Sequence, residues 1–283
     1  MNDANAPNPW NDRSGSSWAR QQQSTDAQLE PFGLAVMDLV APAAGERVLD
    51  VGCGAGQTLL QLAERVGVMG RVVGVDVSEQ LLARARERVA EAGLAQVELV
   101  LGDAATQRFE APFDVVFSRF GVMFFEDAVA AFQNLRRALR AGGRLGFVCW
   151  QAMELNPAFL APLAAARRLA PDQPAPKLLD PGKSGPFYFA DPALIERTLR
   201  AAGFAQLGIE PREFWGLLGG ARTLDEAVAF CLDIGPTARF ISEADPVLAP
   251  AMRDAVREAL APFVRAEGVY MSFQTFLVTA APA

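Results

Sequence analysis

The chain has 283 residues, of which 51% are hydrophobic and 21% charged, and its formal net charge is −7. This length allows one α/β domain with added segments, and the negative charge argues against nucleic acid as a partner, because phosphate-rich partners need a basic face. The sequence contains no histidine, which excludes a histidine general base and the common histidine-based metal sites; no metal site is predicted.

The three cysteines, Cys53, Cys149 and Cys231, are odd in number and show no C-x-x-C spacing. They predict neither a structural disulfide nor a zinc site. No apolar run approaches the roughly 20 residues that span a bilayer, and the N-terminus lacks the basic-then-apolar pattern of a secretion signal. These features together predict a cytoplasmic protein without a membrane span.

The N-terminal segment, residues 1–42, divides into two parts. Residues 1–28 are rich in Asn, Gln, Ser and Asp, which predicts a flexible arm with Trp10 and Trp18 as aromatic anchors. Apolar residues then recur at positions 32, 36, 39 and 40, on one side of a helix expected over 29–42. We interpret residues 1–42 as a lid.

Residues 43–150 alternate between strand and helix patterns, which is typical of a mostly parallel sheet. The expected strands are 47–51, 71–76, 97–101, 113–118 and 144–150. The expected helices are 57–66, 79–92 and 128–140. Ser78 is a good N-cap for the second helix and Gly93 a good stop, so the boundaries in this part are well marked.

Beyond residue 150 the pattern changes. Residues 151–190 hold an expected helix (157–169) and a proline-rich loop. Asp191-Pro192 then begins a helix that Gly203 ends, and residues 204–215 predict a sixth strand. This division gives a cap insertion at 151–190 and a C-terminal part, 191–283, that completes the sheet.

The C-terminal part contains a further helical insertion, 221–267, before a seventh strand at 270–279. Two helices are expected in it, one opened by the capping box Thr223-x-x-Glu226 and one by Asp245-Pro246. We interpret this insertion, with 151–190, as a helical cap over the active site. A surface elaboration or a dimerisation element is the alternative.

The sequence Val48-Leu-Asp-Val-Gly-Cys-Gly-Ala-Gly56 reads as a buried strand, a glycine turn and the start of a helix. A dinucleotide-binding turn, G-x-G-x-x-G, would need glycine or alanine at position 57, where the chain has Gln57. The strand also ends in Asp50, which would repel a pyrophosphate but attract a cation. The ligand favoured here is S-adenosylmethionine, which carries an ammonium and a sulfonium.

A second acidic residue, Asp76, ends the next strand, 24 residues beyond Gly52. An acid at this position can accept hydrogen bonds from both hydroxyls of a ribose. The alternative is that Asp76 caps the following helix, but Ser78 serves that purpose better.

The chain resembles the class I S-adenosylmethionine-dependent methyltransferases over residues 47–150. Five segments in order carry the resemblance: VLDVGCGAG (48–56), VVGVDVS (72–78), ELVLGDAAT (98–106), FDVVFSRFGVMFF (113–125) and RALRAGGRLGFVCW (137–150). Within that family the chain is most similar to small-molecule enzymes of the ubiquinone and menaquinone biosynthesis type. The resemblance implies a doubly wound, mostly parallel seven-stranded α/β sheet, here with helical cap insertions.

The resemblance also implies roles for residues at the ends of the strands. Asp50 would hold the methionine end of the cofactor, unless it only caps the glycine turn. Asp103 would bind the adenine amino group, unless it is a turn residue, and the Ser118 carbonyl would accept from the methionine ammonium. The full cofactor-binding set is Asp50, Gly52, Cys53, Gly54, Asp76, Val77, Asp103, Ala104 and Ser118, with Cys53 a small filler rather than a nucleophile.

Acceptor binding is predicted less sharply. Arg119 would either bind an anionic group or pair with Glu126 or Asp127 as scaffolding. Aromatic and apolar side chains would line a chamber, unless they are simply core. The substrate-binding candidates are Trp18, Arg119, Phe120, Met123, Trp150 and Tyr188.

Methyl transfer from a sulfonium needs mainly alignment, which can lower a barrier by roughly 7–11 kcal/mol. A general base is therefore optional, and the catalytic candidates are Arg119, Glu126 and Tyr188. Asn156-Pro-Ala-Phe159 resembles the Asn-Pro-Pro-aromatic motif of amino-methylating enzymes, but it lacks the second proline. That motif follows the fourth strand, whereas this segment follows the fifth. The predicted function is methyl transfer to a small organic acceptor, with a possible homodimer. A non-catalytic S-adenosylmethionine-binding regulatory or assembly protein and a nicotinamide oxidoreductase are the alternatives.

Overall fold

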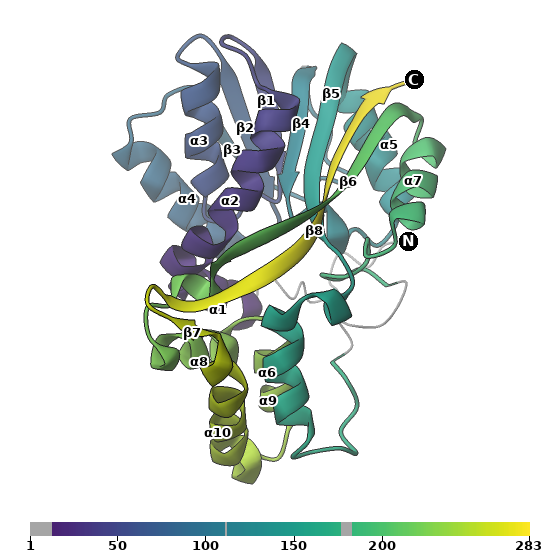
Figure 1. Ribbon diagram of the computed structural model, residues 1–283. Coiled ribbons are helices and arrows are strands. Elements are labelled where there is room, and N and C mark those ends of the chain that lie inside the picture. Colours follow the sequence, from purple (N-terminus) through teal and green to yellow (C-terminus); the bar gives the residue numbers. More distant parts are fainter. Residues whose placement is uncertain (1–12, 111, 177–182) are drawn as a thin grey trace.

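The computed structural model describes residues 13–110, 112–176 and 183–283, and Figure 1 shows a twisted sheet between two helix layers with a separate helical region at one end. The sheet order is β3-β2-β1-β4-β5-β8-β6, with the short β7 paired to β8. The strands are β1 Arg47–Val51, β2 Arg71–Asp76, β3 Val97–Leu101, β4 Phe113–Arg119, β5 Leu139–Trp150, β6 Phe204–Leu217, β7 Val264–Arg265 and β8 Gly268–Pro282.

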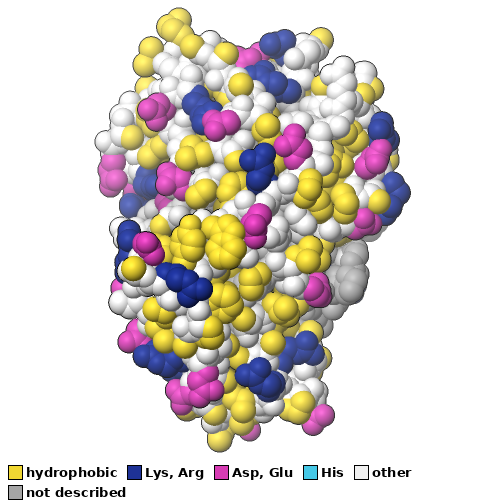
Figure 2. All heavy atoms as spheres, viewed as in Figure 1, with side chains coloured by type: hydrophobic (Ala, Val, Ile, Leu, Met, Phe, Trp, Pro, Cys, Tyr) yellow, Lys and Arg dark blue, Asp and Glu magenta, His cyan; other side chains and the backbone are white. Residues whose placement is uncertain are grey.

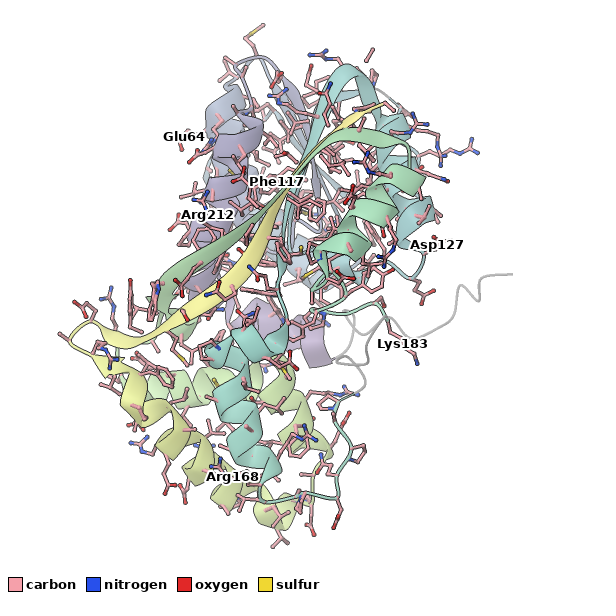
Figure 3. All side chains as sticks on the ribbon, turned by 45° about the vertical axis from the view of Figure 1, so that its right-hand side comes forward. Glu64, Phe117, Asp127, Arg168, Lys183 and Arg212 are labelled. Atoms are coloured by element: carbon pink, nitrogen blue, oxygen red, sulfur yellow. The ribbon has the colours of Figure 1, made fainter. Side chains whose placement is uncertain are left out.

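The sheet is parallel from β3 to β5, whereas β8 runs antiparallel to both β5 and β6. Its centre is apolar on both faces: Val48, Leu49, Val115, Val116 and Phe117 are almost fully buried, as expected where helices cover both sides of a parallel sheet. The predicted doubly wound, mostly parallel α/β fold is confirmed. Figure 3 shows Phe117 inside this layer.

The helices of the core divide between the two faces of the sheet. One face carries α2 (Gln22–Val40), α3 (Gln57–Val66) and α4 (Glu79–Glu91), and the other carries α5 (Ala128–Ala138) and α7 (Pro192–Ala201) (Figure 1). The caps predicted from the sequence are present: Ser78 accepts from Leu81 N at 3.4 Å, and Asp191 accepts from Ala193 N at 2.9 Å. These caps satisfy amides that a helix start leaves unpaired.

The prediction of a flexible arm over residues 1–28 is wrong for the part that the structure describes; residues 1–12, with Trp10, lie outside it. Residues 13–20 form α1 (Arg13–Arg20), and α2 begins at Gln22 rather than at residue 29. The polar side chains that suggested disorder are hydrogen-bonded instead. Ser17 and Arg20 donate to Asp233 at 2.8 Å, so the segment is ordered by long-range polar contacts.

The helical region lies beyond the C-terminal ends of the parallel strands (Figure 1). It contains α6 (Pro157–Arg167), α8 (Leu224–Asp233), α9 (Gly235–Glu243) and α10 (Ala249–Leu260). Residues 218–269, all of them described, hold three α-helices rather than the two expected. The break between α8 and α9 is marked by Gly235, with a φ angle of 85°, and by Pro236 in the first turn of α9, a signal that the sequence analysis missed. The predicted capping box is present at Thr223 and Glu226.

The hairpin of β6 and β8 joins the helical region to the sheet. The pairing of β8 with β5 ends at Trp150↔Thr275, whereas its pairing with β6 continues to Leu217↔Tyr270. The outer half of the hairpin therefore projects past the end of β5 and carries α8–α10 at its tip. This projection positions the helical region at the edge of the sheet where ligands bind in open α/β folds.

Candidate active site

The glycine turn after β1 has the geometry that its sequence predicts. Gly52, Gly54 and Gly56 have φ angles of 72°, 53° and 86°, a region that side-chain-bearing residues rarely adopt. A Cβ atom on Gly52 would lie 2.8 Å from the Cα of Gly121. The turn after β1 and the turn after β4 therefore touch, and only glycine permits that contact.

Asp50 lies beneath this turn with a fully buried side chain. Its Oδ2 accepts a hydrogen bond from the hydroxyl of Thr58 in α3, whereas its Oδ1 has no partner among the residues that the structure describes. Burial raises the pKa of Asp50 to about 7, with the Thr58 hydrogen bond and the Arg119 charge opposing that rise. A buried carboxylate oxygen without a donor is costly, so this atom indicates a cationic or hydrogen-bonding ligand.

Asp76 lies on the other side of the turn and is held in place by backbone amides. Its Oδ2 accepts from Gly54 N at 2.8 Å and its Oδ1 accepts from Ser78 N at 2.9 Å. Burial also raises the pKa of Asp76. Each carboxylate oxygen can accept a second hydrogen bond, so the residue braces the turn and still has capacity for a ribose. We call Asp50, Asp76 and the turn 52–56 the polar crevice.

The other predicted cofactor positions surround this crevice but differ in accessibility. Cys53 is buried against the sheet, and burial raises the pKa of its thiol far above the ordinary range, which fits a filler and not a nucleophile. Val77 is half-buried beside Asp76, and Asp103 is exposed. The Ala104 carbonyl already accepts from Asn134 at 2.9 Å. Ser118 is buried, and its hydroxyl donates to Val51 O at 2.7 Å, which joins β4 to β1.

Arg119 differs from the expected scaffolding arrangement. It contacts neither Glu126 nor Asp127; its guanidinium donates to Gln57 and lies 4.0 Å from Asp26 of α2. Glu126 is exposed, and Asp127 accepts from Ala130 N at the periphery, where Figure 3 shows it. Arg119 therefore points toward the interface of α2 and α3, because those helices supply its polar partners.

Asp26 is the centre of a polar cluster that the sequence did not reveal. It forms a 2.9 Å ion pair with Arg88 of α4, and Arg88 also donates to Ala55 O in the glycine turn at 2.9 Å. Gln57 donates to the Asp26 carbonyl at 3.3 Å. The N-terminal helices are thus joined to the crevice by partly buried polar groups whose pairing no local pattern indicates.

An apolar cluster adjoins the polar crevice, and six separate elements contribute one ring each. Trp150 contacts the rings of Phe32 at 5.3 Å, Phe159 at 5.0 Å and Phe273 at 6.1 Å, and it stacks on Phe120 at 4.0 Å. Phe32 also contacts Phe214 at 4.6 Å. We call this set the aromatic box: Phe32, Phe120, Trp150, Phe159, Phe214 and Phe273.

The sequence analysis identified only two members of this box, Phe120 and Trp150. The other four come from α2, α6, β6 and β8, and only the assembled fold brings them together. Among the other substrate-binding candidates, Met123 is buried and accepts from Gly185 N at 3.0 Å, and Trp18 is half-buried on α1. Tyr188 is half-buried and contacts the core residue Phe189 at 4.7 Å.

Asn156, in the motif that the sequence analysis set aside, has a structural role. Its side chain is fully buried; it donates to Gln151 O, Ala152 O and Gln274 O at 3.1–3.3 Å and accepts from Gln274 N at 2.8 Å. It joins the start of α6 to β8. The residue thus fastens the helical region to the sheet and has no free group for a base or an amine.

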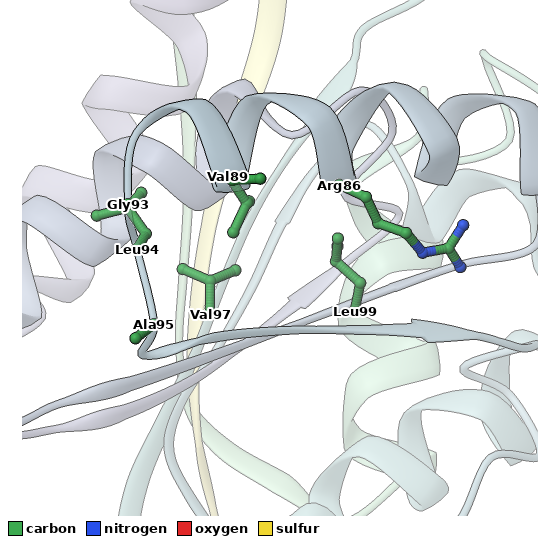
Figure 4. A pocket seen from close by; sticks show the side chains of 8 residues that line it. Arg86, Val89, Gly93, Leu94, Ala95, Val97 and Leu99 are labelled. Atoms are coloured by element: carbon green, nitrogen blue, oxygen red, sulfur yellow. The ribbon is translucent and has the colours of Figure 1, made fainter.

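Two surface hollows lie apart from the polar crevice, and one of them is lined by Arg47, Arg71, Glu98, Arg108 and Glu110. Charges of both signs are interspersed on the face in Figure 2. A hollow between α4 and β3, lined by Arg86, Val89, Leu94, Val97 and Leu99 (Figure 4), contains no pair of titratable groups. In the part of the chain that the structure describes, no cluster of acidic and cysteine side chains could hold a metal, and no helix there is long and apolar enough to cross a membrane.

Comparison with curated proteins gives relatives of known chemistry. Aklanonic acid methyltransferase DauC of Streptomyces sp. (strain C5) is 41% identical over 118 residues, which are 41% of this chain and 54% of that protein. Nocamycin O-methyltransferase of Saccharothrix syringae is 34% identical over 187 residues, 62% of this chain and 65% of that protein. The demethylmenaquinone methyltransferase of Listeria monocytogenes is 37% identical over 113 residues, covering 40% and 48%. The chain spans about half to just under two thirds of these relatives.

Solved structures share the fold at low sequence identity. YcgJ of Bacillus subtilis has a TM-score of 0.57 at 19% identity and covers 89% of this chain and 98% of its own. Phosphoethanolamine N-methyltransferase 2 of Haemonchus contortus has a TM-score of 0.58 at 19% identity, covering 97% and 59%. Residues 48–143 match the family described as "Methyltransferase domain". The chain thus contains a match to a methyltransferase domain over residues 48–143, the part that holds the five sequence segments, and it shares its fold with these solved structures.

Proposed function

We propose that this protein transfers a methyl group from S-adenosylmethionine to a small organic acceptor. The observation that carries the proposal is the unpartnered, fully buried Oδ1 of Asp50 beside a glycine turn. A dinucleotide pyrophosphate would be repelled there, whereas an amino-acid ammonium would donate the hydrogen bond that Oδ1 of Asp50 lacks. S-adenosylmethionine supplies that ammonium and an activated methyl group on a sulfonium.

Each element of the polar crevice has a place in this proposal. Asp50 would hold the ammonium and Asp76 the ribose, with Gly52 and Gly54 lying against the ligand backbone. Val77, Asp103 and Ala104 would lie along the nucleoside. The protein's own contribution is alignment: the turn after β4 touches the glycine turn, so an acceptor in the aromatic box lies beside the cofactor and is held in line with it.

No general base is required for a nucleophile that is already ionised. Arg119 is engaged by Gln57, and Glu126 is exposed; Tyr188 is the remaining candidate for accepting a proton from a hydroxyl. The O-methyltransferase among the relatives makes an oxygen nucleophile the first class to test. We further propose that α1 and α2 form the lid, that α6 with α8–α10 form the cap, and that the protein is cytoplasmic, in keeping with its three unpaired, buried cysteines.

Calorimetric titration of the purified chain with S-adenosylhomocysteine tests cofactor binding. We expect sub-millimolar affinity, and a loss of at least about tenfold for Asp76→Ala, because a charge-assisted hydrogen bond contributes about 1.5–3 kcal/mol. Asp191→Asn, which keeps a helix cap far from the crevice, is the matched control and should bind as the parent does. An absence of affinity at millimolar ligand would contradict the proposal.

Transfer itself needs a second measurement. Incubation with methyl-labelled S-adenosylmethionine and a panel of phenols, carboxylic acids, thiols and amines should label at least one acceptor. Binding without labelling of any panel member would support the alternative of a non-catalytic regulatory protein. Sedimentation of the same preparation tests the possible homodimer.

A further inference from the structure

The two edge strands of the sheet are protected from further pairing to different degrees. At one edge, β6 has Pro211 within the exposed run 210–213, whose other residues are charged, and its pairing with β8 shifts register between Ala205 and Gly208. Proline, charge and irregular pairing all hinder an edge strand from pairing with another chain. At the other edge, β3 pairs with β2 in a regular register, contains no proline and has Glu98 as its one charged residue. The β3 edge is therefore the one that can accept a further strand.

The backbone of β3 has unused hydrogen-bonding groups along this edge. The register with β2 is regular, and Gly102 N donates to Asp76 O at 3.0 Å where the pairing ends. Backbone direction alternates along a strand, so the even-numbered residues of β3 face β2 and the odd-numbered residues face outward. Among the residues that the structure describes, the N–H and C=O groups of Leu99 and Leu101 have no hydrogen-bond partner.

The side chains of β3 are apolar on the face that α4 covers. Val97 and Leu99 line the hollow between α4 and β3, together with Val89 and Leu94 (Figure 4). Leu101 lies on the same face by strand alternation and is 52% exposed. One short strand therefore presents both a protruding leucine and an apolar hollow. A surface that supplies both parts can pair with an identical copy of itself, as a two-fold interface requires.

We propose that β3 is the contact surface between two copies of this chain, and that the two β3 strands pair antiparallel about a two-fold axis at Val100. In this register Leu99 of each copy lies opposite Leu101 of the other, and their free N–H and C=O groups bond to one another. Each Leu101 then covers the hollow beside Leu99 of the other copy. Glu98 lies opposite Gly102 of the other copy, so no like charges face each other. This contact is independent of methyl transfer.

Sedimentation velocity of the full chain over a range of concentrations measures the association. We expect a monomer–dimer equilibrium with a dissociation constant of about 1–100 μM, as suits a small interface. Leu101→Asp places a charge inside the contact and should raise that constant at least about 30-fold. Leu155→Asp changes a leucine of nearly equal exposure, 53%, just before α6. This matched control should associate as the parent chain does.

Cysteine cross-linking tests the register. Val100 faces its own copy across the axis as a pair without mutual hydrogen bonds, for which the Cα atoms lie about 4.5 Å apart, a separation that a disulfide can bridge. Val100→Cys should therefore form a disulfide-linked dimer under mild oxidation. Glu98→Cys should not, because the two copies of residue 98 lie on opposite sides of the axis. The native cysteines are all buried, and the parent chain gives the background.

Two results would overturn the proposed contact: the parent chain sediments as a monomer up to about 300 μM, or Leu101→Asp associates as tightly as the parent. Cross-linking of Glu98→Cys in preference to Val100→Cys would overturn the register. Circular dichroism checks that Leu101→Asp is folded, and Val100→Cys tests the same surface if it is not. These measurements need no ligand, so a failure to bind S-adenosylhomocysteine contradicts the proposed function alone.

Discussion

The two halves of the site are built by opposite means. The polar crevice is made from short neighbouring segments: Asp50, Asp76 and the turn between them come from two adjacent strands and meet through backbone hydrogen bonds. The aromatic box takes one ring from each of six elements between α2 and β8. A ligand shared by a whole family suits the first construction, whereas an acceptor that varies suits the second.

The largest expected effect is on the affinity of the polar crevice for S-adenosylhomocysteine. Asp50→Asn should weaken S-adenosylhomocysteine binding about 100-fold, because removing one charge of a buried, hydrogen-bonded pair costs about 2–5 kcal/mol. Calorimetry measures this affinity, and an affinity equal to that of the parent chain would contradict the assignment of the ammonium to Asp50.

The contact between the two turns is the next test, because Gly121 touches Gly52 of the polar crevice and directly follows Phe120 of the aromatic box. Gly121→Ala places a methyl group 2.5 Å from Val51 O and 3.0 Å from Gly52 Cα, and overpacking of this kind costs about 2 kcal/mol of unfolding free energy. Urea denaturation measures the loss. Gly216→Ala, where no atom lies within 4 Å of the added carbon, is the control, and an equal loss in both variants would argue against the contact.

The pH dependence of S-adenosylhomocysteine binding tests the polar crevice alone, because the Phe and Trp side chains of the aromatic box do not ionise, whereas Asp50 has a pKa near neutrality. With the pKa of Asp50 raised from 3.8 to about 7 by burial, the free protein holds this carboxyl mainly protonated at pH 6 and mainly ionised at pH 8. Affinity for S-adenosylhomocysteine should therefore rise about tenfold over that range. An affinity that is flat between pH 6 and 8 would contradict the assignment of the ammonium to Asp50.

The ionisation of Asp50 also makes the stability of the folded chain depend on pH. Because the pKa of Asp50 is higher in the folded state, protonation of Asp50 stabilises the fold. This stabilisation is fully present below pH 3.8, the unfolded pKa, and is lost as the pH rises through about 7. The unliganded parent should thus lose stability between about pH 4 and pH 7, and Asp50→Asn should not show this component of the loss. Thermal unfolding of both proteins without ligand at several pH values measures the difference.

The smallest expected effect concerns the helical region alone. Thr223→Ala removes the side-chain half of the capping box, in which Glu226 N donates to the Thr223 hydroxyl at 3.2 Å. The loss should be about 1 kcal/mol of unfolding free energy, with cofactor affinity unchanged. Thr223→Ser, which can cap in the same way, is the control for chemical denaturation, and a change in cofactor affinity would indicate coupling between the two ends of the molecule.

The core of the fold could be predicted from local patterns. Strands β1, β2 and β3 match their expected bounds residue for residue, because each is a short, mainly apolar run with a glycine close to one or both of its ends. The start of β5 at Leu139 rather than 144 was missed, since Gly142 and Gly143 read as a turn. Asp50 and Asp76 were identified because an acid at a strand end is a local signal.

The remaining features depend on contacts between distant residues, which no local pattern encodes. The order of α1 depends on Asp233, more than 200 residues along the chain, and composition alone indicated an arm. The orientation of Arg119 depends on Gln57 and Asp26. Phe32, Phe214 and Phe273 each read as ordinary core residues in their own segments, and their common role follows only from the tertiary fold.

The hairpin that carries α8–α10 has a consequence for how such a chain can change. Leu217 and Tyr270 face each other as a strand pair, so the segment between them leaves and re-enters at nearly the same point in space. Its replacement by a shorter turn or by another helical module would leave every sheet pairing up to that point intact. Residues 218–269 can therefore be exchanged as one unit, while the parallel strands and the turns that follow them keep their structure.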